Sequence, residues 1–197
     1  MLSVKMDGSM IETERLKLTP VALEDIEIYT KLLTCEVTTR YLPDGKPFSL
    51  EYIENYVPEK VGRWEKGFGT FIISLKDDPI VKIGYAGVEQ IPNTKFSDIR
   101  YGLLPEFQGK GYAFEASKAV LNFTLETGIV SEVYGVAVIK NRASISLLKN
   151  WVCLSPVINF TTVMNWLRCL LKHAYNKAFK SDSATRASFA SLTVWHA

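Results

Sequence analysis

The sequence predicts an α/β (α+β) fold in which helices flank a mixed, mostly antiparallel twisted sheet. Three extended segments, 70–75, 81–90 and 96–104, follow one another with short turns between them, and strands joined in this way are antiparallel. A helical segment that ends near Thr127 then separates the last of them from a further strand, 132–139. Because a helix lies between two strands, we expect the sheet to be mixed.

The part of the chain before residue 70 supplies one more strand and two helices. Ile11–Pro20 alternates leucines with polar residues and stops at proline, which predicts a first strand. Ala22–Leu33 carries apolar residues at helical spacing and predicts the first helix. We expect a second helix over Leu50–Lys66, with Ser49 as its N-cap and a kink or division at Pro58.

The composition limits the classes of protein to which the chain can belong. Its 197 residues fit one domain, and 47% hydrophobic with 22% charged residues is typical of a soluble globular protein. No run of about 18 apolar residues occurs and the N-terminus lacks the apolar core of a secretion signal, so we expect no membrane partner and a cytoplasmic location. The three cysteines, Cys35, Cys153 and Cys169, lack metal-ligand spacing, so we expect reduced thiols and no metal.

The net charge of +2 hides a division between the body of the chain and its end. Residues 151–197 contain five basic residues and one acidic residue, whereas residues 1–150 contain 18 basic and 20 acidic residues. The body therefore lacks the basic charge of a nucleic-acid binder, and we expect no nucleic-acid partner.

The stretch after segment 96–104 has the layout of an anion-binding site. The strand meets Pro105, passes through a loop with Gly109 and Gly111, and opens into a helix. The first turn of a helix leaves backbone N–H groups without partners, and the helix dipole reinforces them, so a phosphate can bind there. Glycine lets the backbone come close to a pyrophosphate. The alternative is an ordinary turn whose glycines serve chain reversal.

Spacing separates three kinds of phosphate loop. A Walker A loop needs Gly-x4-Gly-Lys-Ser/Thr, which is absent here, and the dinucleotide fingerprint needs a third glycine where Phe114 stands. The pattern that is left, Gln108-x-x-Gly111-x-Ala113, resembles the acetyl-CoA loop of the GNAT superfamily of N-acetyltransferases. With the residues on either side of it, and with the opening 13–16 (Thr-Glu-Arg-Leu), the chain resembles the ribosomal-protein N-terminal acetyltransferase branch.

This resemblance covers roughly residues 10–149 and implies the GNAT acyl-CoA N-acyltransferase fold, with acetyl-CoA as co-substrate and no metal. The loop residues that it implies for cofactor binding are Gln108, Gly109, Lys110, Gly111, Tyr112 and Ala113. In this superfamily the strand that ends at Leu104 splays from the strand 132–139, and the pantetheine arm enters the gap. Backbone groups of Gly102, Leu103 and Leu104 would pair with the pantetheine amides, and one N–H would polarise the thioester carbonyl. The alternative is a fully paired central strand.

A second motif, Asn141 and Ser144, follows the strand 132–139. Asn141 can cap the next helix, and capping alone would explain it. The Asn-x-x-Ser pattern also resembles the family motif in which Asn contacts the cofactor and the hydroxyl protonates the departing CoA thiolate. The resemblance therefore implies a cofactor contact for Asn141 and a general-acid role for Ser144.

A general base is expected to accept the proton of the attacking amine. Glu89, on the strand beside the gap, is the first candidate, and Tyr85 on the same strand is the second. Either residue could instead be an ordinary outward-facing strand residue.

The family pattern stops after Lys149. The family has Lys-Leu-Gly-Phe or a similar sequence there and then two strands, whereas residues 151–197 contain no Glu, three of the four Trp and both His. Moving the reading frame two nucleotides forward makes the codon across Asn150 and Trp151 encode Leu and the next codon Gly, which restores Lys-Leu-Gly. We therefore hypothesise that residues 150–197 are translated from a shifted frame, so that the last strands and any catalytic carboxylate there are absent.

The chain thus divides into an acetyltransferase domain, 1–150, and an atypical tail, 151–197. Apolar residues at helical spacing predict an amphipathic helix of about Val163–Phe179 within this tail. Its apolar side would cover the sheet edge left open or another subunit, which makes a homodimer possible.

The predicted reaction is transfer of the acetyl group of acetyl-CoA to a primary amine of a small molecule or a protein N-terminus by direct attack. An N-terminal peptide, a polyamine and an aminoglycoside stay open as acceptors. One alternative is an acetyl-CoA-binding protein with little or no turnover because the C-terminal segment is altered. Another is an interaction module without a nucleotide ligand.

Overall fold

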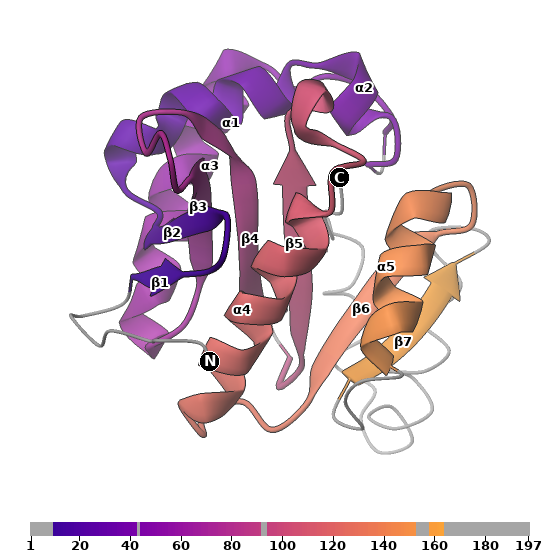
Figure 1. Cartoon of the computed structure of the whole chain (residues 1–197). Helices are drawn as coiled ribbons and strands as arrows, with labels where there is room; N and C mark the ends of the chain where they lie inside the picture. The colour runs from indigo at the N-terminus through magenta and orange to yellow at the C-terminus, as the bar shows by residue number, and fades with distance from the viewer. Residues whose placement is uncertain (1–9, 43, 92–93, 153–157, 164–197) are drawn as a thin grey trace.

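A seven-stranded sheet forms the centre of the fold, and its strands are ordered as they occur in the chain (Figure 1). The computed structural model describes residues 10–42, 44–91, 94–152 and 158–163. The strands are β1 (Ile11–Glu12), β2 (Leu16–Pro20), β3 (Thr70–Leu75), β4 (Lys82–Gln90), β5 (Ser97–Leu103), β6 (Val133–Val138) and β7 (Ile158–Val163). Neighbours from β1 to β5 are antiparallel, whereas β6 is parallel to both β5 and β7. The predicted mixed, mostly antiparallel sheet is confirmed.

Helices cover both faces of this sheet. They are α1 (Ile26–Leu33), α2 (Glu36–Thr39), α3 (Leu50–Gly62), α4 (Tyr112–Glu126) and α5 (Arg142–Val152). α4 crosses one face over β4 and β5, and α1 and α3 lie on the other face (Figure 1). α5 packs against β6 and β7.

Each face of the sheet has its own hydrophobic core, because side chains alternate along a strand. In β3, Phe71 and Ile73 belong to the core under α4, which also contains Val120. Ile72, between them, belongs to the core under α1 and α3, together with Tyr29. All five side chains are fully buried. Burial of this apolar surface is the main term that stabilises the sheet between its helical layers.

Two elements near the N-terminus differ from the sequence prediction. The segment Ile11–Pro20 is not one strand, because the chain turns after Glu12 and the Thr13 N–H donates to the Leu16 carbonyl (2.9 Å). β1 and β2 are therefore an antiparallel pair. The first helix opens with a 3₁₀ turn, and α1 itself begins at Ile26.

The second predicted helix is capped as expected but ends earlier. Ser49 Oγ accepts a hydrogen bond from the Tyr52 N–H (3.2 Å), which confirms the predicted N-cap. α3 continues through Pro58 to Gly62, so the proline does not divide it. A 3₁₀ turn then carries the chain to Lys66.

β5 and β6 pair only where they begin. Ser97 lies opposite Val133 and Asp98 opposite Tyr134, and the later residues of these two described strands do not pair. The strands then separate toward their C-terminal ends (Figure 1). The predicted splay is confirmed, and the alternative of a fully paired central strand is wrong. We call the paired end of β5 and β6 the closed end and the separated end the open end.

β7 was not predicted from the sequence. It pairs with β6 in parallel along its whole length, from Val133 opposite Ile158 to Val138 opposite Val163. The last strands of the family were expected to be absent; residues of the tail nevertheless supply one strand along this edge. The amphipathic helix predicted for about Val163–Phe179, and any dimer contact through it, lie outside the described residues except for Val163, which ends β7.

Candidate active site

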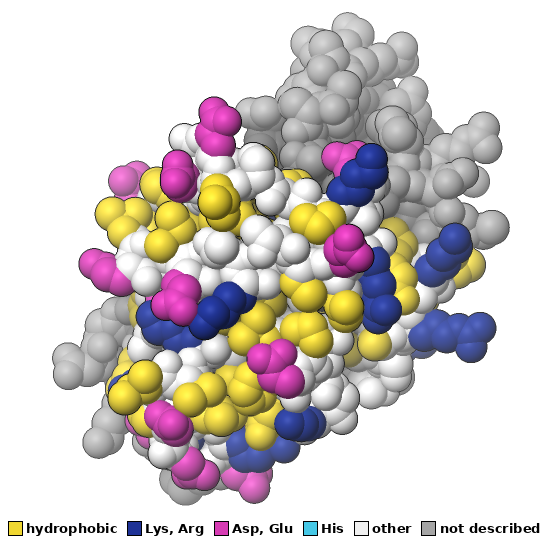
Figure 2. Space-filling view, turned by 90° about the horizontal axis from the view of Figure 1, so that it is seen from above, with side chains coloured by type: hydrophobic (Ala, Val, Ile, Leu, Met, Phe, Trp, Pro, Cys, Tyr) yellow, Lys and Arg dark blue, Asp and Glu magenta, His cyan; other side chains and the backbone are white. Residues whose placement is uncertain are grey.

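A cavity of about 580 Å³ lies at the open end of the sheet. Residues of α2, the end of β5, the loop before α4 and the start of α5 line it. Figure 2 looks down on this end of the molecule and shows Lys and Arg side chains at the right, with further groups at the left and at the bottom. The cavity brings together the two sequence motifs, since Gln108 and Gly111 of the loop share it with Asn141 and Ser144.

The loop before α4 has the backbone of an anion site. Gly109 and Gly111 have φ angles of 73° and 83°, in the left-handed region where a residue with a Cβ is strained. The first backbone hydrogen bond of α4 runs from the Glu115 N–H to the Gly111 carbonyl (3.1 Å). The N–H groups of residues 112–114 precede it and have no acceptor within the helix, so they are available to a phosphate.

The ladder between β4 and β5 decides which backbone groups face the gap. The Leu104 N–H donates to the Ile83 carbonyl (2.9 Å), and hydrogen-bonded pairs alternate along an antiparallel ladder, so Gly102 and Leu104 face β4. Tyr101 and Leu103 therefore direct their backbone groups toward the gap. This corrects the expectation that Gly102 and Leu104 offer backbone groups to the pantetheine arm; Leu103 has the suitable direction.

Close packing fixes the end of β5. Gln108 Nε2 donates to the Leu103 carbonyl (2.9 Å), so this side chain ties the loop to the strand. On the other side, a Cβ at Gly84 would lie 2.1 Å from the Gly102 carbonyl oxygen. Glycine at position 84 therefore allows β4 to approach β5 at the level of the cavity.

Asn141 and Ser144 are joined at the start of α5. Asn141 Oδ1 accepts a hydrogen bond from the Ser144 N–H (3.1 Å), and both residues are buried. Helix capping by Asn141 is thereby confirmed. Burial raises the pKa of Tyr101 to about 12, and a hydrogen bond between its side chain and Ser144 opposes that rise. The hydroxyl of Ser144 thus lies beside a second hydroxyl, in a cavity that both residues line.

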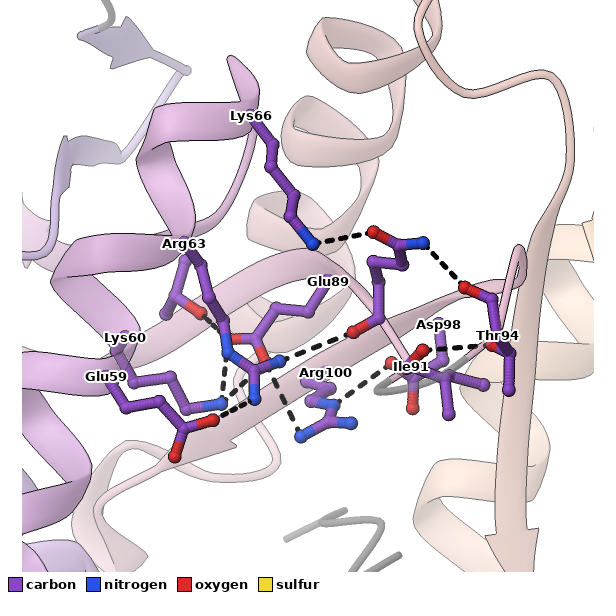
Figure 3. A network of polar contacts seen from close by, with 11 residues as sticks. Glu59, Lys60, Arg63, Lys66, Glu89, Ile91, Thr94, Asp98 and Arg100 are labelled. Carbon is purple, nitrogen blue, oxygen red and sulfur yellow. Dashed lines mark hydrogen bonds and ion pairs between the residues drawn. The ribbon is translucent and has the colours of Figure 1, made fainter. Parts of the chain in front are cut away.

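Glu89 lies at the closed end, inside a buried ionic network (Figure 3). Its carboxylate accepts hydrogen bonds from Lys60 Nζ (2.6 Å), Arg63 Nη1 (2.8 Å) and the Thr70 hydroxyl, and Arg100 Nη1 lies 3.4 Å away. Burial alone would raise the pKa of Glu89, but the three cations outweigh it and hold that pKa well below its usual range. A carboxylate held in this way is a weak base.

Tyr85 is closer to the cavity than Glu89 but is also a poor base. It lies opposite Gly102, whereas Glu89 is four residues further along β4, roughly 13 Å away by strand geometry. Tyr85 is buried and stacks on Tyr29 (ring centroids 5.4 Å apart), and burial raises its pKa well above the usual value. Neither residue is among the described residues that line the cavity. The geometry therefore disfavours both as the base.

Tyr101 and Arg40 are among the residues of the cavity wall that sequence reasoning missed. Tyr101 precedes the motif residues of β5, and strand alternation relative to Leu103 was the signal that could have found it. Arg40 follows α2 and stacks over the Tyr41 ring (4.8 Å). No local pattern marks Arg40, because only the tertiary fold brings α2 to the cavity.

A glycine loop at a helix N-terminus that opens into the gap between two splayed parallel strands defines a class of proteins, the acyl-CoA-dependent acyltransferases. Comparison with known families makes the assignment specific. Residues 15–151 match the model of the acetyltransferase (GNAT) domain. The chain belongs to the GNAT family and is an acetyl-CoA-dependent acetyltransferase.

Solved structures share this fold at low sequence identity. An acetyltransferase from Agrobacterium tumefaciens is 23% identical, with a TM-score of 0.65 over 75% of this chain and 85% of that chain. An acetyl transferase of Salmonella typhimurium that modifies the N-terminal serine of ribosomal protein L7/L12 is 17% identical, with a TM-score of 0.60 over 72% and 83% of the two chains. The microcin C7 self-immunity acetyltransferase MccE, in complex with acetyl-CoA and AMP, is 16% identical, with a TM-score of 0.61 over 75% and 83%.

Two further observations concern the described residues only. None of their helices is long and apolar enough to cross a membrane. No cluster of three or more His, Cys, Asp or Glu side chains in this part of the chain is placed to hold a metal ion.

Proposed function

We propose that the chain transfers the acetyl group of acetyl-CoA to a primary amine of a small molecule or a protein N-terminus by direct attack. The observation that carries this proposal is the cavity that joins the loop before α4 to the end of β5 and the start of α5. In this proposal the pyrophosphate binds to residues 108–113, the pantetheine arm lies along Leu103, and Asn141 contacts the cofactor. The thioester then lies at the open end, near Ser144.

Ser144 is the proposed proton donor. The amine nitrogen forms a bond to the thioester carbon, the C–S bond breaks, and the thiolate takes a proton from the Ser144 hydroxyl. The nitrogen, which became positively charged on attack, gives up its extra proton, and this proton restores the Ser144 hydroxyl. The Tyr101 hydroxyl, which is hydrogen-bonded to Ser144, supports this step because it can hold the serine toward the sulfur. Proton donation of this kind contributes about 10²–10⁴-fold to a rate.

The charge of the cavity bears on the acceptor. The described residues that line it include the cations Arg40, Lys140 and Arg142. This described lining contains no Asp, Glu or His. A polyamine or an aminoglycoside would bring several positive charges to this wall, and like charges repel. The lining therefore favours an acceptor with one amine, or with a carboxylate near the amine.

The acid–base properties favour the same acceptor. Because none of the described lining residues is a well-placed base, we expect the amine to enter the site already neutral. At pH 7.5 roughly a third of an α-amino group is neutral, compared with about one in a thousand of a lysine-like amine. We therefore propose the α-amino group of a peptide or small molecule as the acceptor. The similarity in fold to an acetyltransferase that modifies a protein N-terminal serine, and to the ribosomal-protein branch in general, is consistent with this choice.

An amine panel tests the proposal. The purified chain is mixed with acetyl-CoA and an N-terminal peptide, a polyamine or an aminoglycoside, and release of free CoA thiol is followed. We expect release with the peptide, little with the polycations, and a 10²-fold or larger loss of kcat in Ser144→Ala. A thermal shift with acetyl-CoA but no thiol release from any amine would instead identify a binding protein without turnover. No thermal shift would indicate an interaction module.

We also propose that residues 1–150 form the acetyltransferase domain and that the tail, 151–197, is translated from a shifted frame. The family match ends at residue 151, which supports the boundary. Sequencing the gene tests the frame, and a close relative with the same tail would overturn it. The cytoplasmic location and a homodimer through the tail stay predictions.

A further inference from the structure

A cluster of hydrogen bonds joins the turn between β1 and β2 to the first turn of α4. Glu115 Oε1 accepts from the Thr13 hydroxyl (2.6 Å) and from the Arg15 N–H (2.9 Å). Glu115 Oε2 accepts from Arg15 Nε (2.7 Å) and forms an ion pair with Arg15 Nη2 (2.7 Å). Both guanidinium nitrogens thus meet one carboxylate oxygen in a charge-assisted contact.

Arg15 also holds the glycine loop directly. Its Nη1 donates to the Lys110 carbonyl (3.0 Å), and its guanidinium lies over the Tyr112 ring, 4.6 Å from the centroid. A Cβ at Gly111 would come within 3.3 Å of Arg15 Nη2. Arg15 therefore contacts the loop on both sides of Gly111.

Because the peptide bond is planar, the hydrogen bond from Arg15 to the Lys110 carbonyl also fixes the direction of the Gly111 N–H. In a trans peptide, the carbonyl of one residue and the N–H of the next point to opposite sides. Because Arg15 holds the Lys110 carbonyl, the Gly111 N–H must point away from Arg15. Gly111 lines the cavity, and Arg15 is not among its described lining residues. The hydrogen bond to Lys110 thus presents the Gly111 N–H to the side where the pyrophosphate is proposed to bind.

The same pair adjusts the charge at the helix start. A carboxylate in the first turn of α4 would repel an anion at the N-terminus of the helix. Burial would raise the pKa of Glu115, but the hydrogen bonds from Thr13 and Arg15 outweigh it and lower that pKa, so Glu115 is ionised at neutral pH. The guanidinium of Arg15, in contact with Glu115 Oε2, compensates this charge.

We propose that Arg15 and Glu115 are positioning residues for the pyrophosphate of CoA. Arg15 sets the orientation of the peptide between Lys110 and Gly111, and Glu115 holds Arg15 in place. This inference rests on the proposed binding of CoA to the loop. A loop that is ordered before the cofactor arrives loses less conformational freedom on binding, which increases affinity.

Two donors of different length test the inference. The variants Arg15→Ala and Glu115→Gln are compared with wild type, using acetyl-CoA and S-acetyl-pantetheine, which lacks the pyrophosphate. We expect the Kd for CoA and the KM for acetyl-CoA to rise about ten-fold or more, because the loop must now be ordered on binding. We expect kcat at saturating acetyl-CoA, and kcat/KM for S-acetyl-pantetheine, to stay within about two-fold, because neither depends on a pyrophosphate contact made before chemistry.

Two controls separate this role from a general loss of stability. Lys31→Ala removes an exposed ion pair with Glu27 on α1, away from the loop. It should leave KM and kcat unchanged with both acetyl donors. If Arg15→Ala does not fold, Arg15→Lys is used, because lysine keeps the charge but cannot bond Glu115 and Lys110 together. The same contrast between the two donors is then expected.

The outcomes are distinct. Wild type that binds CoA, with variants that bind it equally well, overturns the inference alone. Variants whose kcat/KM falls equally for acetyl-CoA and for S-acetyl-pantetheine overturn it as well, because the loss is then unrelated to the pyrophosphate. Wild type that does not bind CoA overturns the proposed function and the inference with it.

Discussion

The open and closed ends of the splayed strand pair each use a glutamate with an arginine, but in different surroundings. At the open end, Glu115 and Arg15 have side chains 17% and 44% exposed. At the closed end, Glu89, Lys60 and Arg100 are at most 3% exposed. The same pairing of residue types therefore lies partly in water at one end and fully inside protein at the other.

This difference in exposure separates stability from function. A buried charge that loses its partner cannot be solvated by water instead, so breaking the pair lowers the free energy of unfolding strongly. A partly exposed pair that is broken can be solvated, and its energetic contribution to folding is small. What it loses is a defined geometry. The closed end therefore supports the fold, and the open end supports the orientation of the loop.

The largest effect is expected at the closed end. Glu89→Gln removes the negative charge that Lys60, Arg63 and Arg100 share, so it should lower the free energy of unfolding by about 3–5 kcal/mol. Chemical denaturation measures this value. The matched control is Glu59→Gln, which removes an exposed partner of Arg63 and should change stability little.

The pH dependence of the same variant sharpens the comparison. The pKa of Glu89 is lower in the folded chain than in the unfolded chain. Its contribution to stability is therefore full above the unfolded value of about 4.3 and is lost as the pH falls toward the folded pKa. The gap in melting temperature between wild type and Glu89→Gln should narrow as the pH falls below about 4. A gap that is unchanged at low pH would contradict the network as its source.

A smaller effect is expected from Gly84→Ala at the open end. The new Cβ would lie 2.1 Å from the Gly102 carbonyl oxygen, so β4 and β5 must move apart. Overpacking of this kind destabilises by about 1–3 kcal/mol, and the shift should also lower kcat because β5 borders the cavity. Gly62→Ala is the control, since its Cβ would meet no atom within 4 Å. Equal behaviour of the two variants would show that the close approach at Gly84 has no consequence.

Asn141→Ala should have a smaller effect on stability than on cofactor binding. It removes the N-cap of α5 and should lower the free energy of unfolding by about 1 kcal/mol. If Asn141 also contacts the cofactor, the Kd for CoA should rise. Asn141→Asp keeps a capping oxygen, so it should restore stability without restoring CoA affinity. Full recovery of both in this variant would leave capping as the sole role of Asn141.

The smallest effect is expected for Lys31→Ala. The ion pair between Lys31 and Glu27 is exposed and lies within one helix, so we expect no measurable change in the melting temperature. A thermal melt measures this change. A clear loss of stability would show that exposure does not decide how much an ion pair contributes to folding stability in this protein.

Local sequence was a good guide wherever neighbouring residues alone decide the conformation. The glycines at 109 and 111, the cap at Ser49 and the cap at Asn141 were all predicted, because a positive φ or a cap depends on residues a few positions away. The family pattern correctly indicated the splay of the strands on either side of α4. The sequence was a weaker guide to the role of Glu89, which was predicted as the general base but lies in a buried ionic network. The residues that contact a strand residue come from elsewhere in the chain, so its position in the sequence does not reveal them.

The sequence by itself determined the class of fold, the anion-binding loop and the acetyltransferase family. Only the tertiary structure decided which backbone groups of β5 face the gap, since that depends on pairing with β4. It also decided that Glu89 meets Lys60 and that Glu115 meets Arg15, contacts between residues 29 and 100 positions apart. Such contacts follow from packing and burial over the whole chain rather than from any local pattern. The conformation of the glycine loop therefore follows from its own residues, while its orientation depends on the turn between β1 and β2, which carries Arg15.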